Sequence, residues 1–496
     1  MSLLSVLLQG LVADAPTLDV VGLALDNRQI TPGMAFVALR GTRQHGLAYA
    51  AAAVQAGGAV AVLYEPEAGL AVPTLGVPVL AVPGLPMVLG QIAARFYQQP
   101  ADSLFMVGVT GTDGKTSTTH FIAEALGQAG EPAAVLGTLG IGKPGDLRKA
   151  THTTPDAIHV HGHLRGLLAA GFGTVAMEVS SHALDQGRVN AVGFDVAVLT
   201  NLTRDHLDYH GTVEAYAEAK RRLFHWQGLR HAVLNLDDAF GRKLAVELAA
   251  TAVQVTGYGV GAVDAYPATA VVATAAVFDD QGIRAQVVTP AGAGELQAPV
   301  LGRFNLHNLL AALAVLLAKG LPLATALRAL QHVQTVPGRM QRVQVAGHGE
   351  GVLVVVDYAH TPGALDQVLR AVRVHTSGRL LCVFGCGGDR DAGKRPLMAQ
   401  AAEREADGVI VTDDNPRTES PEQIFTDIRK GFADAGQVIF EHDRAKAIRL
   451  AIGQAQTGDT VVIAGKGHET VQILASQTVP FDDREQAVLA LRECAV

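Results

Sequence analysis

The stretch from Phe105 to Thr119, FMVGVTGTDGKTSTT, decides the fold of the chain around it. Phe105 to Val109 is a short apolar run with a β-branched end, as expected of a buried strand, and helical spacing of apolar residues begins at Thr118. Glycines fill the loop between them, with Lys115 and Thr116 directly after. Such a loop lets backbone N–H groups approach phosphate oxygens, and the helix N-terminus adds partial positive charge. The stretch therefore predicts a nucleotide triphosphate site at a strand–loop–helix corner.

This loop is a variant of the usual phosphate-binding pattern. G-x-x-x-x-G-K-[ST] requires glycine at position 109, where this chain has Val109. Lys115 is expected to reach the β- and γ-phosphates, and the Thr116 hydroxyl to bind Mg²⁺. The alternative is a structural corner that carries Gly-Lys-Thr by chance, and the strand before and helix after the loop argue against it.

Composition sets limits on size and partners. A chain of 496 residues predicts about three domains at ~150 residues each. Hydrophobic residues make up 49% and aromatic residues only 5%, so the cores must consist mostly of Ala, Val and Leu. The net charge of −8 gives no overall field that would attract nucleic acid or anionic membranes. Local clusters of Arg and Lys must therefore hold any anionic ligand.

The cysteines and the N-terminus indicate a cytoplasmic protein. Cys382, Cys386 and Cys494 are odd in number and widely placed, which fits a reducing compartment better than a disulfide framework. We interpret the first two as a buried strand thiol and a loop thiol rather than a metal clip. The N-terminal MSLLSVLLQGLVAD lacks a basic leader, and no apolar run reaches the ~18 residues of a membrane helix.

The chain divides into three predicted domains, 1–100, 101–336 and 337–496. The first reads as a small α/β domain with strands at 20–25, 34–39 and 59–63, and with prolines that mark turns near 73–86. Its Arg28, Arg40, Arg43 and His45 either hold an anionic ligand or are solvated surface charge. The third repeats strand–loop–helix units, which predicts a parallel, doubly wound sheet.

Polar residues follow two predicted strands of the middle domain, at 174–179 and 194–200. Glu178 ends the first strand and His206 comes after the second. Ligands of α/β proteins bind at the carboxyl ends of parallel strands, so both should lie near the phosphate loop. With Thr116 they could complete an oxygen-rich Mg²⁺ site. A capping or ion-pair role for Glu178 is the alternative.

Two helices of the middle domain carry further candidates. Thr154-Pro155-Asp156 predicts a helix start with Thr154 as the cap. His159, His161 and His163 follow, and residues two apart face different sides of a helix, so a solvated face is favoured over a metal site. Lys220 lies on a predicted helix at 212–224 and is either partly buried or a snorkelling surface lysine.

Charged residues collect after the strands of the third domain, as Arg390, Asp414-Asn415-Pro416-Arg417 and Lys466-Gly467-His468-Glu469. Arg417 can hold a carboxylate through two hydrogen bonds, Asn415 can donate and accept, and Glu469 can accept from an ammonium. Together they suit the head group of an amino acid. Helix caps and surface ion pairs are the alternative for each residue taken singly.

Seven motifs, in this order along nearly the whole chain, resemble the Mur ligase family. They are GTDGKT at 111–116, MEVSSH at 177–182, TNLTRDHLDYHG at 200–211, YAEAK at 216–220, GRFNLHN at 302–308, PGRM at 337–340 and VDYAHTP at 356–362. The resemblance implies a three-domain α/β fold. It consists of a small N-terminal α/β domain that binds the UDP-linked substrate, a central P-loop ATPase-like domain with a mostly parallel sheet, and a C-terminal Rossmann-like domain that binds the amino acid.

The resemblance also implies an activity. DNPR at 414–417 matches the branch of the family that adds meso-diaminopimelate to UDP-N-acetylmuramoyl-L-alanyl-D-glutamate through an acyl phosphate, with ATP and Mg²⁺, in peptidoglycan precursor synthesis. Such an enzyme serves cell-wall biogenesis, and with it cell shape and division. We expect a cytoplasmic monomer that binds small molecules and neither nucleic acid nor membrane. The same reaction with L-lysine is the alternative, which Arg417 argues against. A P-loop transport or motor ATPase is less consistent with Val109 and the metal-site residues.

Site residues carry over from the family motif by motif. The implied catalytic residues are Lys115, His206 and Lys220. The implied ATP contacts are Gly111, Thr112, Asp113, Gly114, Lys115, Thr116, Ser117, Asn305, Arg339 and Asp357. The implied metal site is Thr116, Glu178, His206 and Lys220 as a carbamate. The UDP-substrate set is Asn27, His45, Thr153, Thr154, Ser180, Gln186 and Arg188. The diaminopimelate set is Arg390, Asp414, Asn415, Pro416, Arg417, Gly465 and Glu469.

Three positions depart from the family pattern. Asp113 stands where asparagine is usual, and its charge predicts a side chain that points away from phosphate or caps the loop. Asn27 and His45 stand where serine and aspartate are common, and both lie in the segment 26–46 that would contact uridine.

Overall fold

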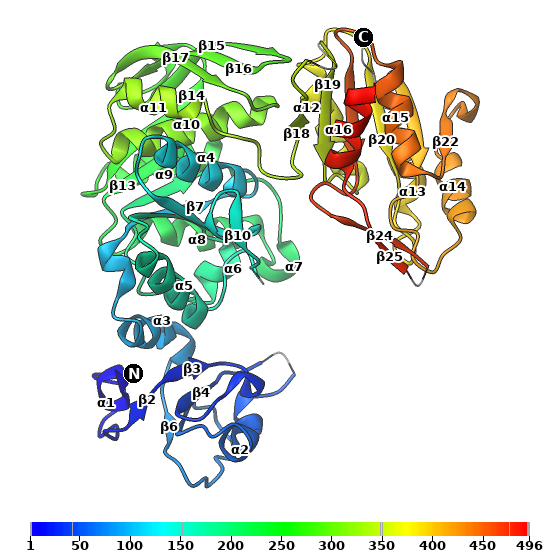
Figure 1. The fold of residues 1–496 in the computed structure, drawn as a ribbon. Coiled ribbons are helices and arrows are strands. Elements are labelled where there is room, and N and C mark those ends of the chain that lie inside the picture. The colour runs from blue at the N-terminus through cyan, green and yellow to red at the C-terminus, as the bar shows by residue number, and fades with distance from the viewer. Residues whose placement is uncertain are drawn as a thin grey trace. The chain divides into compact units, whose positions relative to one another are not determined.

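A computed structural model describes residues 2–41, 43–150, 152–347, 349, 351–475 and 477–493 (Figure 1). Cys494 lies outside these residues. The chain forms two compact units, one of residues 1–258 with 314–321 and one of residues 259–313 with 322–496, and each is described by itself. In the described part of the chain no helix is long and apolar enough to cross a membrane.

The first unit begins with a four-stranded parallel sheet in the order β3-β4-β5-β6. Alternate residues of its strands face opposite sides, so Ala35 and Val37 pack toward α3 while Phe36 and Ala38 pack toward α2. The elements are β1 (Ser2–Leu3), α1 (Leu4–Leu7), β2 (Asp19–Val20), β3 (Gly22–Ala24), β4 (Met34–Ala38), α2 (Ala50–Gln55), β5 (Ala61–Tyr64), β6 (Val79–Ala81) and α3 (Leu85–Phe96).

Here the sequence predicted three strands but not β6 or α3. The prolines of this segment were interpreted as turns, but Pro86 lies in the first turn of α3. That position tolerates proline because its backbone N–H would have no helical partner.

A second sheet holds the phosphate loop. β7 (Phe105–Thr110) lies between β11 and β12 with parallel pairing on both sides, so that Val109 pairs with Glu178 and Thr110 with Leu199. The carboxyl ends of three strands therefore meet at one edge, as predicted. The parallel strands in spatial order are β8 (Ala133–Gly137), β11 (Thr174–Glu178), β7, β12 (Val196–Leu199), β13 (His231–Asn235) and β14 (Gln254–Val260).

Helices of this region differ from prediction at their starts. α4 (Lys115–Gln128) begins directly at Lys115. α5 (Ala157–Ala169) is capped by Asp156, whose carboxylate accepts from two backbone N–H groups, so the predicted cap at Thr154 is wrong. The stretch after β8 forms antiparallel strands that the sequence did not predict. The remaining elements are β9 (Gly140–Lys143), β10 (Asp146–Arg148), α6 (Ser181–Asp185), α7 (Leu207–His210), α8 (Val213–Arg221) and α9 (Ala239–Leu248).

The second unit opens with three antiparallel strands that the sequence did not predict. They are followed by two helices and, beyond residue 337, by a six-stranded sheet in the order β18-β19-β23-β20-β21-β22, parallel except at β18. The first elements are β15 (Val271–Asp279), β16 (Gly282–Thr289), β17 (Gly292–Ala298), α10 (Arg303–Ala318) and α11 (Leu323–Leu330).

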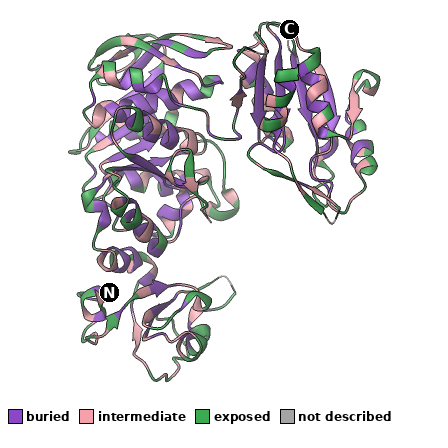
Figure 2. Cartoon of the chain, viewed as in Figure 1, coloured by how far each residue is buried: buried purple, intermediate pink, exposed green. Residues whose placement is uncertain are grey.

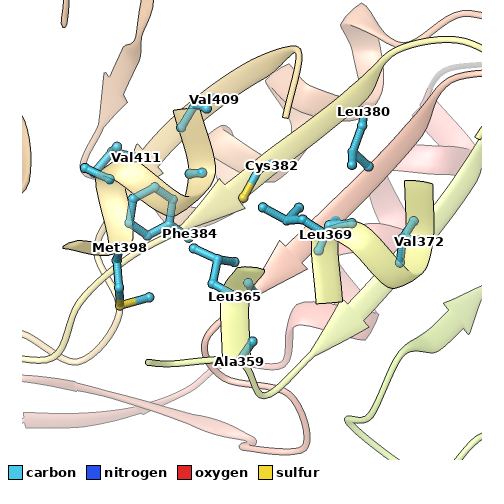
Figure 3. Packing of buried hydrophobic residues seen from close by; sticks show 14 of the residues in the cluster. Ala359, Leu365, Leu369, Val372, Leu380, Cys382, Phe384, Met398, Val409 and Val411 are labelled. Atoms are coloured by element: carbon cyan, nitrogen blue, oxygen red, sulfur yellow. The ribbon is translucent and has the colours of Figure 1, made fainter. Parts of the chain in front are cut away.

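The six-stranded sheet is doubly wound, which confirms the predicted α/β class. Leu353 and Val355 face a core formed with α12, α13 and α14, while Val354 and Val356 face α15 and α16. In Figure 3, Leu365 and Leu369 of α12 lie against Cys382 and Phe384 of β20, and Figure 2 shows the strands buried beneath partly exposed helices. The elements are β18 (Gln341–Val343), β19 (Leu353–Asp357), α12 (Pro362–Arg373), β20 (Leu380–Phe384), α13 (Lys394–Glu405), β21 (Gly408–Thr412), α14 (Pro421–Arg429), β22 (Ile439–Glu441), α15 (Arg444–Gln454), β23 (Thr460–Ala464), β24 (Val471–Leu474), β25 (Gln477–Pro480) and α16 (Asp483–Glu493).

Short 3₁₀ turns complete the chain. They are η1 (Asn27–Gln29), η2 (Gly46–Tyr49), η3 (Pro100–Ser103), η4 (Arg222–His225), η5 (Val263–Ala265) and η6 (Ala435–Gln437). The helix predicted at 212–224 is thus α8 followed by η4. Cys382 lies in β20 and Cys386 just after it, both buried as free thiols, and burial raises the pKa of each to about 12.

Candidate active site

The phosphate loop is fastened by backbone and side-chain groups that follow β12. The Thr112 N–H donates to the Asn201 carbonyl (3.0 Å), and the Asp113 N–H donates to Asn201 Oδ1 (2.9 Å). The Thr200 hydroxyl donates to the Asp113 carbonyl (2.5 Å). A Cβ at Gly111, where φ is +150°, would overlap that hydroxyl, so this position requires glycine. The Asp113 side chain is exposed, and its backbone alone fixes the loop.

Partly buried Lys115 and buried Lys220 point at the same carbonyl of this loop. Lys115 Nζ donates to the carbonyls of Gly111 (2.9 Å) and Thr112 (2.8 Å), and Lys220 Nζ donates to that of Gly111 (2.8 Å). Lys220 is 1% exposed, so it is not a snorkelling surface lysine. Burial lowers the pKa of Lys115, and burial together with the neighbouring Lys115 charge lowers the pKa of Lys220 well below its ordinary value.

Glu178 is a buried carboxyl between the loop and β8. Its Oε2 accepts from the hydroxyls of Thr116 (3.0 Å) and Thr138 (3.1 Å), and its Oε1 accepts from the Thr138 N–H (2.8 Å). Burial raises the pKa of Glu178. The structure thus brings together the oxygens of Thr116 and Glu178, as predicted from their places at neighbouring strand ends.

The predicted substrate residues of this unit continue outward from Glu178. Thr138 Oγ1 lies 3.0 Å from Thr153 Oγ1, hydroxyl to hydroxyl, and Thr154 Oγ1 donates to the Glu178 carbonyl (2.8 Å). The remaining members join through hydrogen bonds of 2.6–3.2 Å: Ser180 N–H to Thr154 Oγ1, Arg188 Nη1 to the Thr154 carbonyl, and Arg188 Nε and Nη2 to Gln186 Oε1. Thr154 therefore joins the loop before α5 to the end of β11 instead of capping a helix.

His206 occupies a left-handed conformation (φ +51°) just before α7. Its N–H donates to Asp205 Oδ1 (2.8 Å), and its ring lies 4.8 Å from the His182 ring and 6.0 Å from that of Tyr216. Tyr216 in turn lies 3.2 Å, hydroxyl to hydroxyl, from Thr112. Among the described contacts of His206 neither Thr116 nor Glu178 occurs, so its place in a metal site stays a prediction.

Sequence reasoning did not single out Tyr209. Its hydroxyl donates to Asp185 Oδ2 (2.9 Å) and accepts from Gln186 Nε2 (3.1 Å), while its ring stacks 4.3 Å from that of His182. It therefore fixes the amide of Gln186, which orients Arg188. The signal in the sequence was the TRDHLDYHG motif itself, but nothing in the motif indicated which partner the tyrosine would find.

Of the three histidines of α5, His159 and His163 are ring neighbours at 6.1 Å, whereas His161 has other partners. His159 Nδ1 pairs with Asp156 (2.6 Å), which raises the pKa of His159, whereas buried His161 donates to the Asn190 carbonyl (3.1 Å). Over the described residues, no three His, Cys, Asp or Glu side chains are grouped so as to hold a metal ion.

The predicted uridine contacts lie in the four-stranded domain. His45 Nδ1 accepts from the Leu47 N–H (3.0 Å) and its Nε2 contacts the Glu65 carbonyl (3.0 Å), so both ring nitrogens serve the fold. Asn27 begins η1 and is partly exposed. The nearby Arg28 and Arg40 form surface ion pairs with Asp26 and Glu67.

The predicted ATP contacts of the second unit are also held by local bonds. Asn305 is buried, with Nδ2 donating to the Leu301 carbonyl (2.7 Å) and Oδ1 accepting from Asn308 (2.9 Å). Asp357 accepts from the N–H groups of Met340 and Ala359 (2.7 Å each), and burial raises its pKa. Arg339 lies over the Tyr358 ring, 5.6 Å from its centre. Ser117, the last predicted contact, belongs to the first unit and lies in the first turn of α4.

The predicted amino-acid pocket forms one connected group after β21 and β23. Asn415 Nδ2 donates to Glu469 Oε2 (3.0 Å), and buried Lys466 donates to Asn415 Oδ1 (3.1 Å) and Glu469 (3.3 Å). Arg417 has a left-handed backbone (φ +54°), and its Nη1 donates to the Gly388 carbonyl (2.8 Å). Arg390 is exposed on the loop after β20. Lys466 had been noted only as a charge near a strand end.

Asp414 and Gly465 lie beneath this group. Asp414 is buried with a raised pKa, and its Oδ1 is 3.6 Å from Lys466 Nζ. A Cβ at Gly465, where φ is +120°, would lie 3.4 Å from Asp414 Oδ2. Arg444 forms a fully buried pair with Asp483 (2.7 Å) behind them. The Pro416 carbonyl accepts a hydrogen bond from the Glu419 N–H (3.2 Å), which closes a turn that includes Arg417.

Comparison with known proteins covers nearly the full chain. A ligase from Pseudomonas aeruginosa named UDP-N-acetylmuramoyl-L-alanyl-D-glutamate–2,6-diaminopimelate ligase is 53% identical over 469 residues, 95% of this chain and 94% of its own. A ligase of the same name from Synechococcus elongatus is 47% identical and covers 98% of this chain and 99% of its own. A solved structure of a ligase with that name has a TM-score of 0.79 at 38% identity, over 99% of both chains.

More distant structures show the fold alone. MurF from Acinetobacter baumannii has a TM-score of 0.59 at 21% identity and covers 91% of this chain and 92% of its own. Three family descriptions match: "Mur ligase family, catalytic domain" at 19–97, "Mur ligase middle domain" at 109–316 and "Mur ligase, glutamate ligase domain" at 338–467. On these matches and the 53% identity, the chain belongs to the Mur ligase family.

Proposed function

We propose that this protein is the ATP-dependent ligase that joins meso-diaminopimelate to UDP-N-acetylmuramoyl-L-alanyl-D-glutamate. The observation that carries the proposal is the identity of 53% over 95% of the chain to a ligase of that name. The connected residues around Glu178 and around Asn415 supply the two kinds of chemistry such a reaction needs. One group suits an anionic nucleotide and a metal ion, and the other suits an amino acid.

The phosphate loop fits ATP and Mg²⁺. Lys115 and Lys220 hold buried ammonium groups against neutral carbonyls, and arriving phosphate oxygens would give them anionic partners. Thr116 and Glu178 would hold Mg²⁺, because hydroxyl and carboxylate oxygens are the ligands this ion prefers. The ion would neutralise charge on the transferring phosphoryl group.

Lys220 as a carbamate follows from the same surroundings. Its lowered pKa favours the neutral amine, which is the form that attacks CO₂. The amine nitrogen bonds to the carbon of CO₂ and loses a proton, so a buried cation becomes an anionic oxygen ligand. That change would remove the repulsion between Lys220 and Lys115 and add a second set of oxygens for metal.

The proposed reaction has two steps. The γ-carboxylate of the D-glutamyl residue attacks the γ-phosphorus of ATP, ADP leaves, and an acyl phosphate forms. Lys115 offsets the repulsion between the two anions, and the Arg188–Gln186 pair and Thr154 bind the substrate beside Glu178. The amine of diaminopimelate then attacks the acyl carbon, loses a proton, and phosphate leaves as the amide forms.

Measurement of phosphate release tests the function. The reaction contains ATP, Mg²⁺, the UDP-linked dipeptide and either meso-diaminopimelate or L-lysine, with mass spectrometry of the product. Release that depends on all components, with diaminopimelate strongly preferred, is the expected result. Equal or greater turnover with lysine would contradict the substrate, and no acceptor-dependent release would contradict the function. Lys115→Met should abolish release, whereas Lys446→Met, a change at an exposed residue paired with Glu441, should not.

A further inference from the structure

Lys466 is a buried cation that the proposed reaction does not use directly. It follows β23 and Gly465, and its side chain is 0% exposed. Its ammonium lies 3.1 Å from Asn415 Oδ1, 3.3 Å from Glu469 Oε2 and 3.6 Å from Asp414 Oδ1. All three neighbours belong to the predicted amino-acid pocket. Lys466 is therefore in contact with the pocket from its buried side.

The orientation of the Asn415 amide is fixed by this contact. Its Oδ1 accepts from Lys466 and from the Ile473 N–H (3.0 Å), which are both donors, so the amide cannot be turned over without facing two donors with its own N–H groups. Its Nδ2 donates one hydrogen to Glu469 Oε2. Asn415 thus keeps one remaining N–H for a ligand, which makes it a donor and not an acceptor in the pocket.

Lys466 and Asn415 both contact the same carboxylate oxygen of Glu469. Oε2 accepts from both Asn415 and Lys466, and the side chain is 32% exposed. The Oε1 atom is left as an acceptor toward solvent. The pocket therefore offers a donor at Asn415 and an acceptor at Glu469. Lys466 supports both assignments, together with the Ile473 N–H at Asn415 Oδ1.

We propose that Lys466 is a positioning residue that gives the pocket its polarity, so that Asn415 faces the carboxylate and Glu469 faces the ammonium of one amino-acid head group. This inference rests on the proposed function. Lys466 acts through Asn415 and Glu469 and does not touch the substrate.

If Lys466 served only the stability of the fold, its replacement would affect the KM values of all three substrates alike. Removing one partner of a buried ion pair usually costs stability, because it leaves a buried charge unpaired. Here the Glu469 side chain is 32% exposed and burial raises the pKa of Asp414, so water and a proton can compensate the two carboxyl groups. Lys466→Met should therefore still fold, with the Asn415 amide held less firmly, by the Ile473 N–H and Glu469, and with Glu469 freer to move. The affinity for the amino acid would fall, and sites elsewhere would be unaffected.

The experiment compares Michaelis constants in the full-length enzyme. For Lys466→Met we expect the KM for meso-diaminopimelate to rise roughly tenfold or more, the loss of one charge-assisted hydrogen bond. The KM values for ATP and the dipeptide should stay within about twofold, since those contacts are unchanged. Lys466→Gln, which keeps a donor toward Asn415 without the charge, should lie between wild type and Lys466→Met. Lys446→Met serves as the matched surface control.

A double variant tests the route of action. If Lys466 acts through Asn415, then Lys466→Met combined with Asn415→Ala should raise the KM for diaminopimelate far less than the product of the two single effects. Four results would each overturn the inference. The KM for diaminopimelate could stay unchanged in Lys466→Met and Lys466→Gln, or the KM values of all three substrates could rise in parallel. The two substitutions could have independent effects in the double variant, or both lysine variants could fail to fold. A wild-type enzyme that releases no phosphate with diaminopimelate would instead overturn the proposed function.

Discussion

Gly137, the last residue of β8, offers the sharpest test of the site at Glu178. A Cβ added there would lie 2.7 Å from Cδ and 2.8 Å from Cγ of Glu178, and closer still to Oε1. Gly137 is not among the glycines with positive φ, so alanine fits its backbone. The effect of Gly137→Ala therefore comes from the collision with Glu178 and not from backbone strain.

The collision displaces a carboxyl group that is buried and held by hydrogen bonds. Glu178 is 1% exposed and accepts three hydrogen bonds from Thr116 and Thr138. Relief of the overlap requires a shift of about 1 Å, and misplacement on that scale costs on the order of 100-fold in rate. Overpacking of this kind also costs about 1–3 kcal/mol of stability. We expect a folded enzyme with a large loss of kcat and a higher Mg²⁺ requirement.

The assay is phosphate release with saturating substrates, repeated over a Mg²⁺ titration, with urea unfolding in parallel. Gly166→Ala is the matched control, because Gly166 lies within α5 with nothing within 4 Å of its added Cβ. It should leave kcat unchanged and raise the stability by up to about 1 kcal/mol.

A result near wild type would refute the reasoning. If kcat of Gly137→Ala stays within about threefold of wild type at every Mg²⁺ concentration, then the position of Glu178 does not limit the reaction. A loss of activity equal to the loss of folded protein would refute it as well, because the change would then act on stability alone.

Three further predictions concern other buried or partnered groups. Lys220→Ala should be nearly inactive and partly restored by short carboxylic acids; full activity without them would exclude a carbamate. Tyr209→Phe should raise the KM for the dipeptide roughly tenfold by freeing Gln186, with the KM for diaminopimelate unchanged, and equal changes in both would contradict a role in orientation. His120, whose pKa burial lowers from 6.5 to about 4, stabilises the fold above pH 6.5 and loses this as the pH falls toward 4. Between those limits wild type should therefore lose about 3 kcal/mol more than His120→Leu in urea unfolding, and parallel curves would contradict the shift.

The sequence predicted best those features that depend on local pattern. The strand before the phosphate loop is the apolar run that the sequence predicted, and the repeated strand–loop–helix units of the third domain form a mostly parallel sheet, as expected. β16 and β17 were missed because small and polar residues interrupt their apolar positions. β15 is mostly apolar, and its pattern could have indicated a strand. The predicted cap at Thr154 was wrong because the Asp156 carboxylate, two residues later, is a better acceptor for the first N–H groups of the helix. The Thr154 hydroxyl instead donates to the Glu178 carbonyl.

The state of each site residue depended on distant partners. The motif placed Lys220 on a helix, but the partner of its ammonium group is the Gly111 carbonyl, 109 residues away. Lys466 was visible as a charge, but its contact with Asn415 joins two different strand ends. For His45 and Asn305 the motif indicated ligand contacts, whereas their polar atoms already bond backbone and side chains of their own domains. Spacing locates such residues and does not reveal which hydrogen bonds they already make.

Lys115, Lys220 and Lys466 differ in the groups that their ammonium groups contact. In the described part of the chain Lys115 and Lys220 make hydrogen bonds to carbonyl oxygens and no ion pair, and both have lowered pKa values. Their positive charge is poorly compensated, so a bound polyphosphate would give both lysines the anionic partners that the carbonyl oxygens do not supply. Lys466 already contacts two carboxyl groups. Its charge is compensated within the fold, as the proposed positioning role requires.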